Sequence, residues 1–244
     1  MLSTLRLVPA TSSRVLLLRN SASPFLRRSF LRPMSTATLI KTSDHVGGPL
    51  IEAIADDHQE MYTYYYEYVK NKGNVDAQER WARQLIWEVA RHAIGEELVV
   101  YPLMEKHLGA EGKRLADEDR QEHLQVKELL YQIESVKVGT EEHASILKAV
   151  VDHLKPHNDS EEQKDLPALQ KAIGNDAAAE AAASFKRTKK FVPTRSHPSA
   201  PDQPPMETVA GLMAAPLDKL KDMFAKFPTD EDKAAAKEEA KRLN

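Results

Sequence analysis

Four histidines recur at equivalent places in two halves of this chain, and this repeat restricts the folds that the chain can adopt. When the sequence is shifted by 65 residues, His58 falls on His123 and His92 falls on His157. Each half reads acid-His, then thirty-three residues, then His-x-x-x-Glu-Glu. Such a repeat predicts two similar helix pairs related by a pseudo-twofold axis. The acidic positions that repeat in the same way are Asp57 with Glu122, Glu96 with Glu161, and Glu97 with Glu162.

The hydrophobic pattern around these histidines is helical. From Pro49 to about Leu169, apolar residues recur at steps of three and four, which marks one face of a helix. Breaks fall near residues 71–74, near residues 109–112 and near Gly139. Four helices with short connections pack most simply as an up-down-up-down bundle. The predicted fold is therefore all-α: a four-helix bundle with a helical and proline-rich C-terminal extension.

The predicted core faces carry polar residues where a bundle normally has Leu, Ile, Val or Ala. A buried polar group is costly unless it has a partner, so histidines on all four helices indicate a common partner. Residues four apart on a helix lie on one face, about 5–6 Å from each other, so His92 with Glu96, and His157 with Glu161, can serve one metal pocket each. The predicted metal ligands are His58, His92, Glu96, His123, His157 and Glu161.

The ligand types indicate which metal and which chemistry to expect. The chain has no cysteine, so nitrogen and oxygen atoms must hold the metal. Two irons, bridged by both carboxylates and by an oxo or hydroxo group, would each have five ligands and one position open for dioxygen, nitric oxide or peroxide. Zinc and manganese suit the same ligands. Ferritin-type di-iron oxidases use more glutamates than histidines, and the reversed ratio here favours a protein that binds or senses a ligand over an enzyme.

The first 40 residues differ from the rest. They contain six arginines, many serines and leucines and no acidic residue, which is typical of a mitochondrial transit peptide, although a disordered basic arm has a similar composition. We expect localisation to the mitochondrial matrix, and a cytosolic form if synthesis starts at Met34. Loss of residues 1–33 removes six positive charges and shifts the formal net charge from −3 to −9. A chain this acidic argues against a nucleic-acid partner.

The predicted domains are the transit peptide at 1–40, the bundle at 45–172 and an extension at 173–244. The extension begins alanine-rich, continues through a proline-rich linker and ends in an amphipathic helix that we expect to start close to Pro216. An alternative function is therefore a non-redox module that docks a protein partner or a membrane surface through this helix. No apolar run is long enough to span a bilayer. The apolar stripe of the helix is Met213, Leu217, Leu220, Phe224 and Phe227.

Several motifs resemble the hemerythrin-like HHE cation-binding domain, over roughly residues 45–170. They are Asp57-His58, RHAIGEELVVYP at 91–102, Gln121-Glu122-His123 and HNDSEEQKDLP at 157–167. The tail segment from Val192 onward resembles that of fungal members. The resemblance implies a four-helix bundle with a non-haem di-iron centre that binds or senses dioxygen, nitric oxide or iron. By motif, the four histidines would be ligands, and Glu96 and Glu161 would be the bridging carboxylates.

The sequence departs from the oxygen-carrying hemerythrins at two places. Their fifth histidine is missing, and Asp119, one turn before His123, either supplies an oxygen ligand or is a solvated or capping carboxylate near the helix start. Pro156 precedes His157 and predicts a kink after which a new helical turn starts. The carriers also space this last pair one residue wider, which would select Glu162 over Glu161. A weak oxidase or peroxidase at the same site is a further alternative. We expect Glu97 to be solvated or to support a ligand.

Overall fold

The computed structural model describes residues 37–42, 47–203 and 206–243. These residues form helices and connecting segments without a β-strand, so the predicted all-α class is confirmed. The targeting prediction for residues 1–40 concerns mainly residues 1–36, which lie outside the described ranges.

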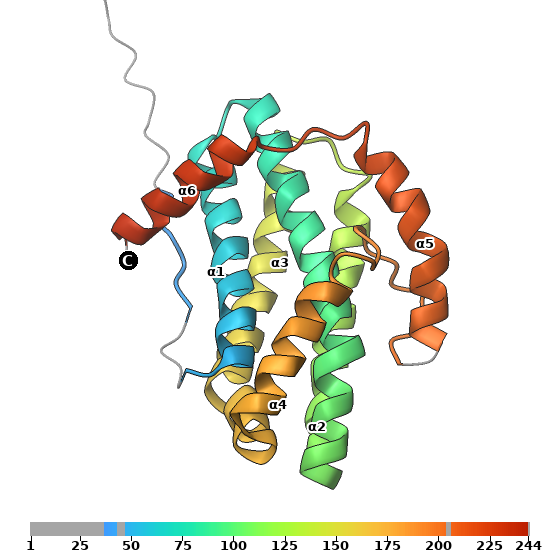
Figure 1. The fold of residues 1–244 in the computed structure, drawn as a ribbon. Helices are drawn as coiled ribbons and strands as arrows, with labels where there is room; N and C mark the ends of the chain where they lie inside the picture. The colour runs from blue at the N-terminus through green and yellow to red at the C-terminus, as the bar shows by residue number, and fades with distance from the viewer. Residues whose placement is uncertain (1–36, 43–46, 204–205, 244) are drawn as a thin grey trace, which may run out of the picture. The chain divides into compact units, whose positions relative to one another are not determined.

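The bundle consists of four helical segments that run alternately up and down (Figure 1). The second and third segments are the two parts of α2, which meet at Gly109, where φ is 62° and the helix breaks. Positive φ suits glycine because it has no Cβ. The fourth segment runs from α3 through a π-helical turn into α4. The bounds are α1 Pro49–Lys70, α2 Val75–Ile133, α3 Glu141–Ser160, η1 Glu161–Asp165 and α4 Leu166–Thr188.

Local sequence signals fix where the helices begin. Pro49 opens α1, where its missing N–H costs no hydrogen bond. Asn74 caps α2 by accepting a hydrogen bond from the N–H of Ala77, and Thr140 caps α3 by accepting one from the N–H of His143. The predicted breaks near 71–74, 109–112 and 139 all coincide with interruptions between helical segments.

The core has two apolar clusters with a polar layer between them. Along α1, Ile54 belongs to one cluster, His58 to the polar layer and Met61 to the other cluster. The same order, or its reverse, holds along the other three segments, since each crosses the bundle once. The polar layer is therefore closed off from solvent at both ends, and charges within it must be neutralised locally. Its histidines and glutamates are His58, His92, Glu96, Glu97, His123, His157, Glu161 and Glu162, all at most 4% exposed.

The extension does not begin where the bundle core ends. Helix α4 crosses residue 172, breaks at Gly174, where φ is 77°, and continues to Thr188, with Ala178 and Phe185 in the core cluster that contains Ile54. The amphipathic helix α5 spans Met206–Asp222, so the prediction that it starts close to Pro216 is wrong, and Pro216 lies inside the helix. Helix α6, Asp230–Leu243, contacts α1. None of the described helices is long and apolar enough to cross a bilayer.

Candidate metal centre

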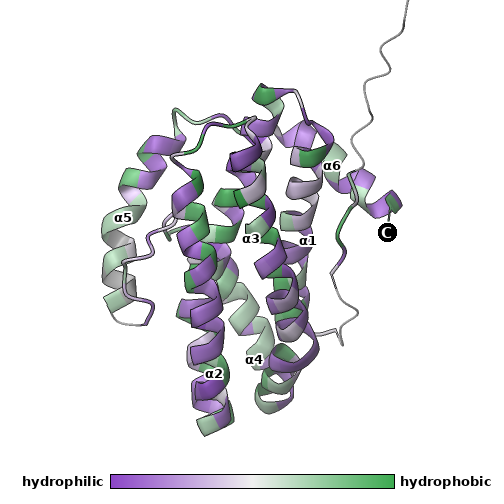
Figure 2. Ribbon diagram, turned by 180° about the vertical axis from the view of Figure 1, so that it is seen from behind, coloured by the Kyte–Doolittle hydropathy of each residue, from purple (hydrophilic) through white to green (hydrophobic). Residues whose placement is uncertain are grey.

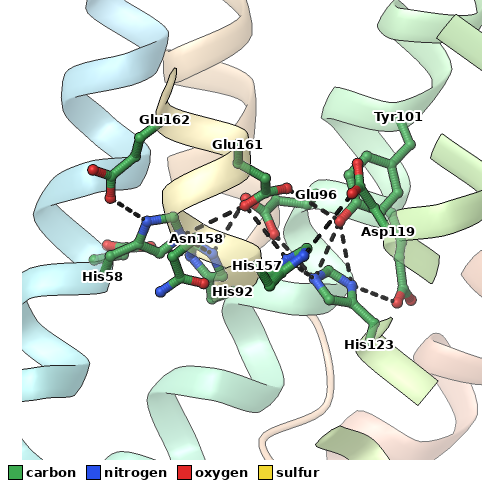
Figure 3. Close-up of polar contacts among 12 residues, drawn as sticks. His58, His92, Glu96, Tyr101, Asp119, His123, His157, Asn158, Glu161 and Glu162 are labelled. Atoms are coloured by element: carbon green, nitrogen blue, oxygen red, sulfur yellow. Dashed lines mark hydrogen bonds and ion pairs between the residues drawn. The ribbon is translucent and has the colours of Figure 1, made fainter. Parts of the chain in front are cut away.

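The Nε2 atoms of four histidines face the middle of the polar layer, two from each half of the repeat (Figure 3). The Nε2 atoms of His58 and His92 lie 3.1 Å apart, and those of His123 and His157 also lie 3.1 Å apart. We call the first pair the first half-site and the second pair the second half-site. The pseudo-twofold symmetry that the repeat predicts is thus visible in the geometry of the imidazoles.

Two carboxylates lie between the half-sites. Glu96 Oε1 is 3.2 Å from His92 Nε2, and Glu96 Oε2 is 3.5 Å from His123 Nε2. Glu161 Oε2 is 3.5 Å from His157 Nε2 and 3.7 Å from His58 Nε2. Each carboxylate therefore reaches one imidazole of each half-site, which is the placement that a bridging ligand needs. The structure brings together all six residues that the sequence predicts as ligands.

The Nδ1 atoms point outward, each to a carboxylate. His92 donates to Asp57 at 3.0 Å, and the equivalent His157 donates to Glu122 at 2.7 Å. A carboxylate acceptor at Nδ1 holds the proton there and leaves the Nε2 lone pair facing the centre, as in metal-bound histidines. The remaining two contacts follow the same symmetry and join His58 to Glu162 at 2.7 Å and His123 to Glu97 at 3.0 Å.

The centre has the chemistry of a cation site. Both oxygens of Glu96, and Oε2 of Glu161, are buried and make no hydrogen bond among the described residues. Pairs of Nε2 lone pairs at 3.1 Å repel unless a proton or a metal ion lies between them. The ligand atoms of His58, His92, Glu96 and Glu161 all lie within 4.8 Å of one another, as do those of Glu96, His123 and His157. A third overlapping set consists of Asp119, His157 and Glu161, and these nitrogen and oxygen donors could hold metal cations.

The two central carboxyl groups differ in their pKa values. Burial alone would raise the pKa of Glu96, but the charge of His92 and the contacts with His123 hold it well below its usual value. Burial and the negative charge of Glu96 raise the pKa of Glu161 well above its usual value. Without a cation, the centre therefore keeps a proton on Glu161, because two buried carboxylates at this distance repel each other. A metal dication would replace that proton.

Pro156 does not restart the helix before His157. Helix α3 continues through Pro156 to Ser160, and the expected capped turn does not form, since the Asn158 side chain donates to Tyr62 Oη at 2.8 Å instead. The irregularity comes later, as the π-turn η1 at Glu161–Asp165. It is Glu161 that contacts the Nε2 atoms, whereas Glu162 supports His58 from outside.

Two polar residues beside the second half-site break the symmetry. Asp119 is 6% exposed and lies well inside α2, so the solvated or capping role is wrong, and its Oδ1 lies 3.9 Å from His157 Nδ1. Burial, followed by the negative charge of Asp165, raises the pKa of Asp119 to about 8. Tyr101 Oη lies 3.1 Å from His123 Nε2 and donates to Glu161 Oε1 at 3.3 Å. The equivalent positions beside the first half-site are Ile54 and Leu166, which are buried and apolar.

The outer carboxylates were partly missed by sequence reasoning. Glu97 is fully buried, not solvated, and holds His123 while it pairs with Lys127 at 2.5 Å. A signal was present, because Glu97 and Glu162 repeat at the same offset as the ligands. Tyr101, Phe185 and Lys189 had no comparable signal, since Leu166 replaces Tyr101 in the second half of the repeat and the other two residues lie beyond the repeat.

The fold and the centre define a class of protein: a helical bundle that encloses a histidine- and carboxylate-rich cation site. The family model of the hemerythrin HHE cation-binding domain matches residues 50–169. An uncharacterised hemerythrin-like protein of Schizosaccharomyces pombe is 49% identical over 177 residues, which cover 72% of this chain and 87% of the relative. The chain belongs to the hemerythrin HHE family. No solved structure matches it.

Proposed function

We propose that this protein holds two iron ions between its half-sites and binds or senses a small ligand, either dioxygen, nitric oxide or peroxide. The observation that carries the proposal is the buried convergence of four Nε2 atoms on two carboxylates with unpaired oxygens. His58, His92, His123 and His157 would each supply one nitrogen, and Glu96 and Glu161 would bridge. A pair of irons supplies reversible one-electron chemistry and open coordination positions for such ligands.

The surrounding residues favour binding over turnover. Apolar clusters close both ends of the polar layer, which excludes bulk water and larger substrates. The outer carboxylates fix the tautomer of every imidazole and so preorganise the donors. Tyr101 Oη lies beside the second half-site, where it can donate a hydrogen bond to a bound anion or to Glu161.

Metal analysis tests the proposal. Chain purified without metal, loaded with ferrous iron under nitrogen and freed of excess should hold two irons, and His92→Ala should hold fewer. His153→Ala is the matched control, because His153 is an exposed histidine one turn before His157. Absorption spectra before and after addition of dioxygen or nitric oxide should then change reversibly. Clearly substoichiometric iron that His92→Ala leaves unchanged would refute the proposal, and sustained turnover of peroxide above free iron would favour an oxidase or peroxidase.

A second function rests on the exposed face of α5. Figure 2 shows apolar residues over much of this helix. The α5 apolar face consists of Met213, Leu217 and Leu220 and is continued by Phe224, just after the helix ends; these side chains are 54–84% exposed. Two acidic residues of α5 turn inward instead: Asp218 accepts from the N–H of Arg195 at 3.2 Å, and Asp222 accepts from its guanidinium at 3.0 Å. Lys219 and Lys221 remain exposed beside the apolar face.

We propose that this face docks on an anionic lipid surface, because an apolar stripe with exposed lysines and inward-facing acids suits interfacial binding. The full chain should sediment with vesicles of phosphatidylcholine and phosphatidylglycerol and less with phosphatidylcholine alone. Leu220→Ser with Phe224→Ser should abolish sedimentation, whereas Leu243→Ser, at an exposed leucine of α6, should not. A dimer in solution that the double variant dissociates would show instead that a second copy covers this face.

A further inference from the structure

Two residues from a segment outside the repeat, Phe185 and Lys189, contact the outer side of the first half-site. Phe185, in the second part of α4, is fully buried and packs edge-on against the His92 ring, with ring centroids 5.6 Å apart and an interplanar angle of 89°. Lys189, which follows α4, has its ammonium group against the carboxylate of Asp57, the residue that accepts the Nδ1 proton of His92. Both contacts therefore converge on one predicted ligand.

The Lys189 side chain is held in place from several sides. It is 8% exposed, and its Nζ also lies 2.5 Å from Glu88 Oε1, which shares its carboxylate with Arg91 at 2.8 Å. The ammonium group lies 5.4 Å from the Phe185 ring centroid, within range of a cation–π interaction. With two carboxylates and one aromatic ring around it, Lys189 has little freedom to leave Asp57.

Gly95 shows how closely this segment approaches the centre. A Cβ at Gly95 would lie 2.8 Å from Cε2 of Phe185 and 3.3 Å from Cγ of Lys189, which is too close for the ring to keep its place. Gly95 directly precedes the central Glu96. Its equivalent in the second half is Ser160, and there the outer carboxylate Glu122 has a side chain that is 54% exposed. The close cover is thus particular to the first half-site.

We propose that Lys189 and Phe185 are positioning residues of the metal centre, and that they hold the Asp57–His92 pair so that the first half-site binds its ion more tightly. The inference rests on the proposed function and adds a role for the chain beyond the repeat. Lys189 holds the Asp57 carboxylate in place against Nδ1 of His92, and Phe185 fixes the plane of the imidazole. An imidazole with a fixed tautomer and plane loses less freedom when it binds a metal, and loss of such a support typically weakens metal binding by about 10–100-fold.

The test is a competition titration of the full chain with a chromophoric chelator and cobalt(II), which reports two successive affinities. Lys189→Met should weaken one of them by about tenfold or more and leave the other in place. Lys189→Arg should restore most of the loss. Lys190→Met, at the exposed neighbouring lysine, is the matched control and should behave as wild type.

A spectroscopic readout separates positioning from general stability. In the cobalt-loaded protein, the Nδ1 proton of His92 gives a paramagnetically shifted resonance whose exchange with solvent should accelerate in Lys189→Met. Gly95→Ala, which displaces the buried Phe185 ring, should weaken the same affinity and leave the other in place. Equal weakening of both affinities, or wild-type affinities in both variants, would overturn the inference. A wild-type chain that binds no metal would overturn the proposed function, and this inference with it.

Discussion

The two half-sites have the same ligands in different surroundings. The first half-site has Ile54 and Leu166 at the positions where the second half-site has Asp119 and Tyr101. The carboxylates that accept the Nδ1 protons also differ. Asp57, beside His92, is covered by Lys189, whereas Glu122, beside His157, is half-exposed. The two halves of the repeat therefore share their donor atoms, but apolar side chains flank the first half-site and additional polar side chains flank the second. We expect the first half-site to bind metal more tightly and the second to be the one that responds to pH and ligand.

The shared carboxylate should matter most, because it serves both half-sites. Glu96→Ala removes the group that lies within 3.5 Å of His92 and His123, so both metal affinities should fall by more than the roughly 100-fold upper range for outer supports. Stoichiometry after gel filtration measures this. Glu60→Ala, at a half-buried glutamate of α1, is a suitable control. Loss of only one ion in Glu96→Ala would mean that the two half-sites do not share this residue.

The outer carboxylates should differ between the halves. Asp57→Asn removes the buried acceptor of His92 and should weaken one affinity by about 10–100-fold. Glu122→Gln removes the equivalent acceptor of His157, but water can replace a side chain that is 54% exposed, so we expect a change of only a few-fold. The same chelator titration compares them. Equal losses would remove the proposed distinction between a covered and an open half-site.

Asp119 should make the metal-free protein sensitive to pH. Its pKa in the folded protein is about 8, against an ordinary value of 3.8, so the folded chain keeps a proton that the unfolded chain has released. The free energy of unfolding should then fall as pH rises from about 4 to 8, by up to ~1.4 kcal/mol per pH unit from this group. Asp165, whose pKa is raised to about 6, contributes at the lower end.

Denaturant unfolding between pH 6.5 and 8 isolates the contribution of Asp119. Asp119→Asn should flatten the pH dependence, whereas Asp152→Asn, at an exposed aspartate of α3, should leave it as in wild type. A wild-type stability that is constant or rises over this range would contradict the buried, protonated state of Asp119.

Tyr101 should have the smallest effect. Tyr101→Phe removes one hydrogen bond to Glu161 Oε1 and keeps the ring, so the second half-site should lose about 1 kcal/mol, or roughly fivefold in affinity. Leu166→Ile, at the equivalent apolar position, should leave both affinities close to wild type. An effect of Tyr101→Phe on the tighter affinity instead would reverse the assignment of the two half-sites.

The sequence was sufficient for the fold and for the inner donors. Steps of three and four residues gave the helices, and glycine and capping residues gave their ends. The offset of 65 residues predicted that four histidines, Glu96 and Glu161 lie together, because residues on one face of each helix in a short-looped bundle must meet in its core. The paired Glu97 and Glu162 were visible in the same offset, but spacing alone left Glu97 either solvated or supporting a ligand, and left Glu162 as an alternative ligand to Glu161.

Other features depended on the tertiary structure. Sequence alone predicted a restart of the helix at Pro156, whereas α3 continues through this proline to Ser160 and the irregular turn follows at Glu161–Asp165. Helix periodicity could not place α5, which begins ten residues before Pro216. The break of α4 at Gly174, where φ is 77°, could not be inferred from residue spacing. This break sets the direction of the second part of α4, which carries Phe185 to His92 and leads to Lys189 beside Asp57.

By itself, then, the sequence determined which atoms face the centre. Helical spacing shows which residues share one face of a helix, and the offset of 65 residues shows which faces are equivalent. Only the tertiary structure decided which residues outside the repeat contact the imidazoles and their carboxylate acceptors. Lys189 lies 132 residues from Asp57, and no local rule connects the two. Burial and charge pairing between such distant residues cover the outer carboxylate of one half-site, Asp57, and leave that of the other, Glu122, half-exposed.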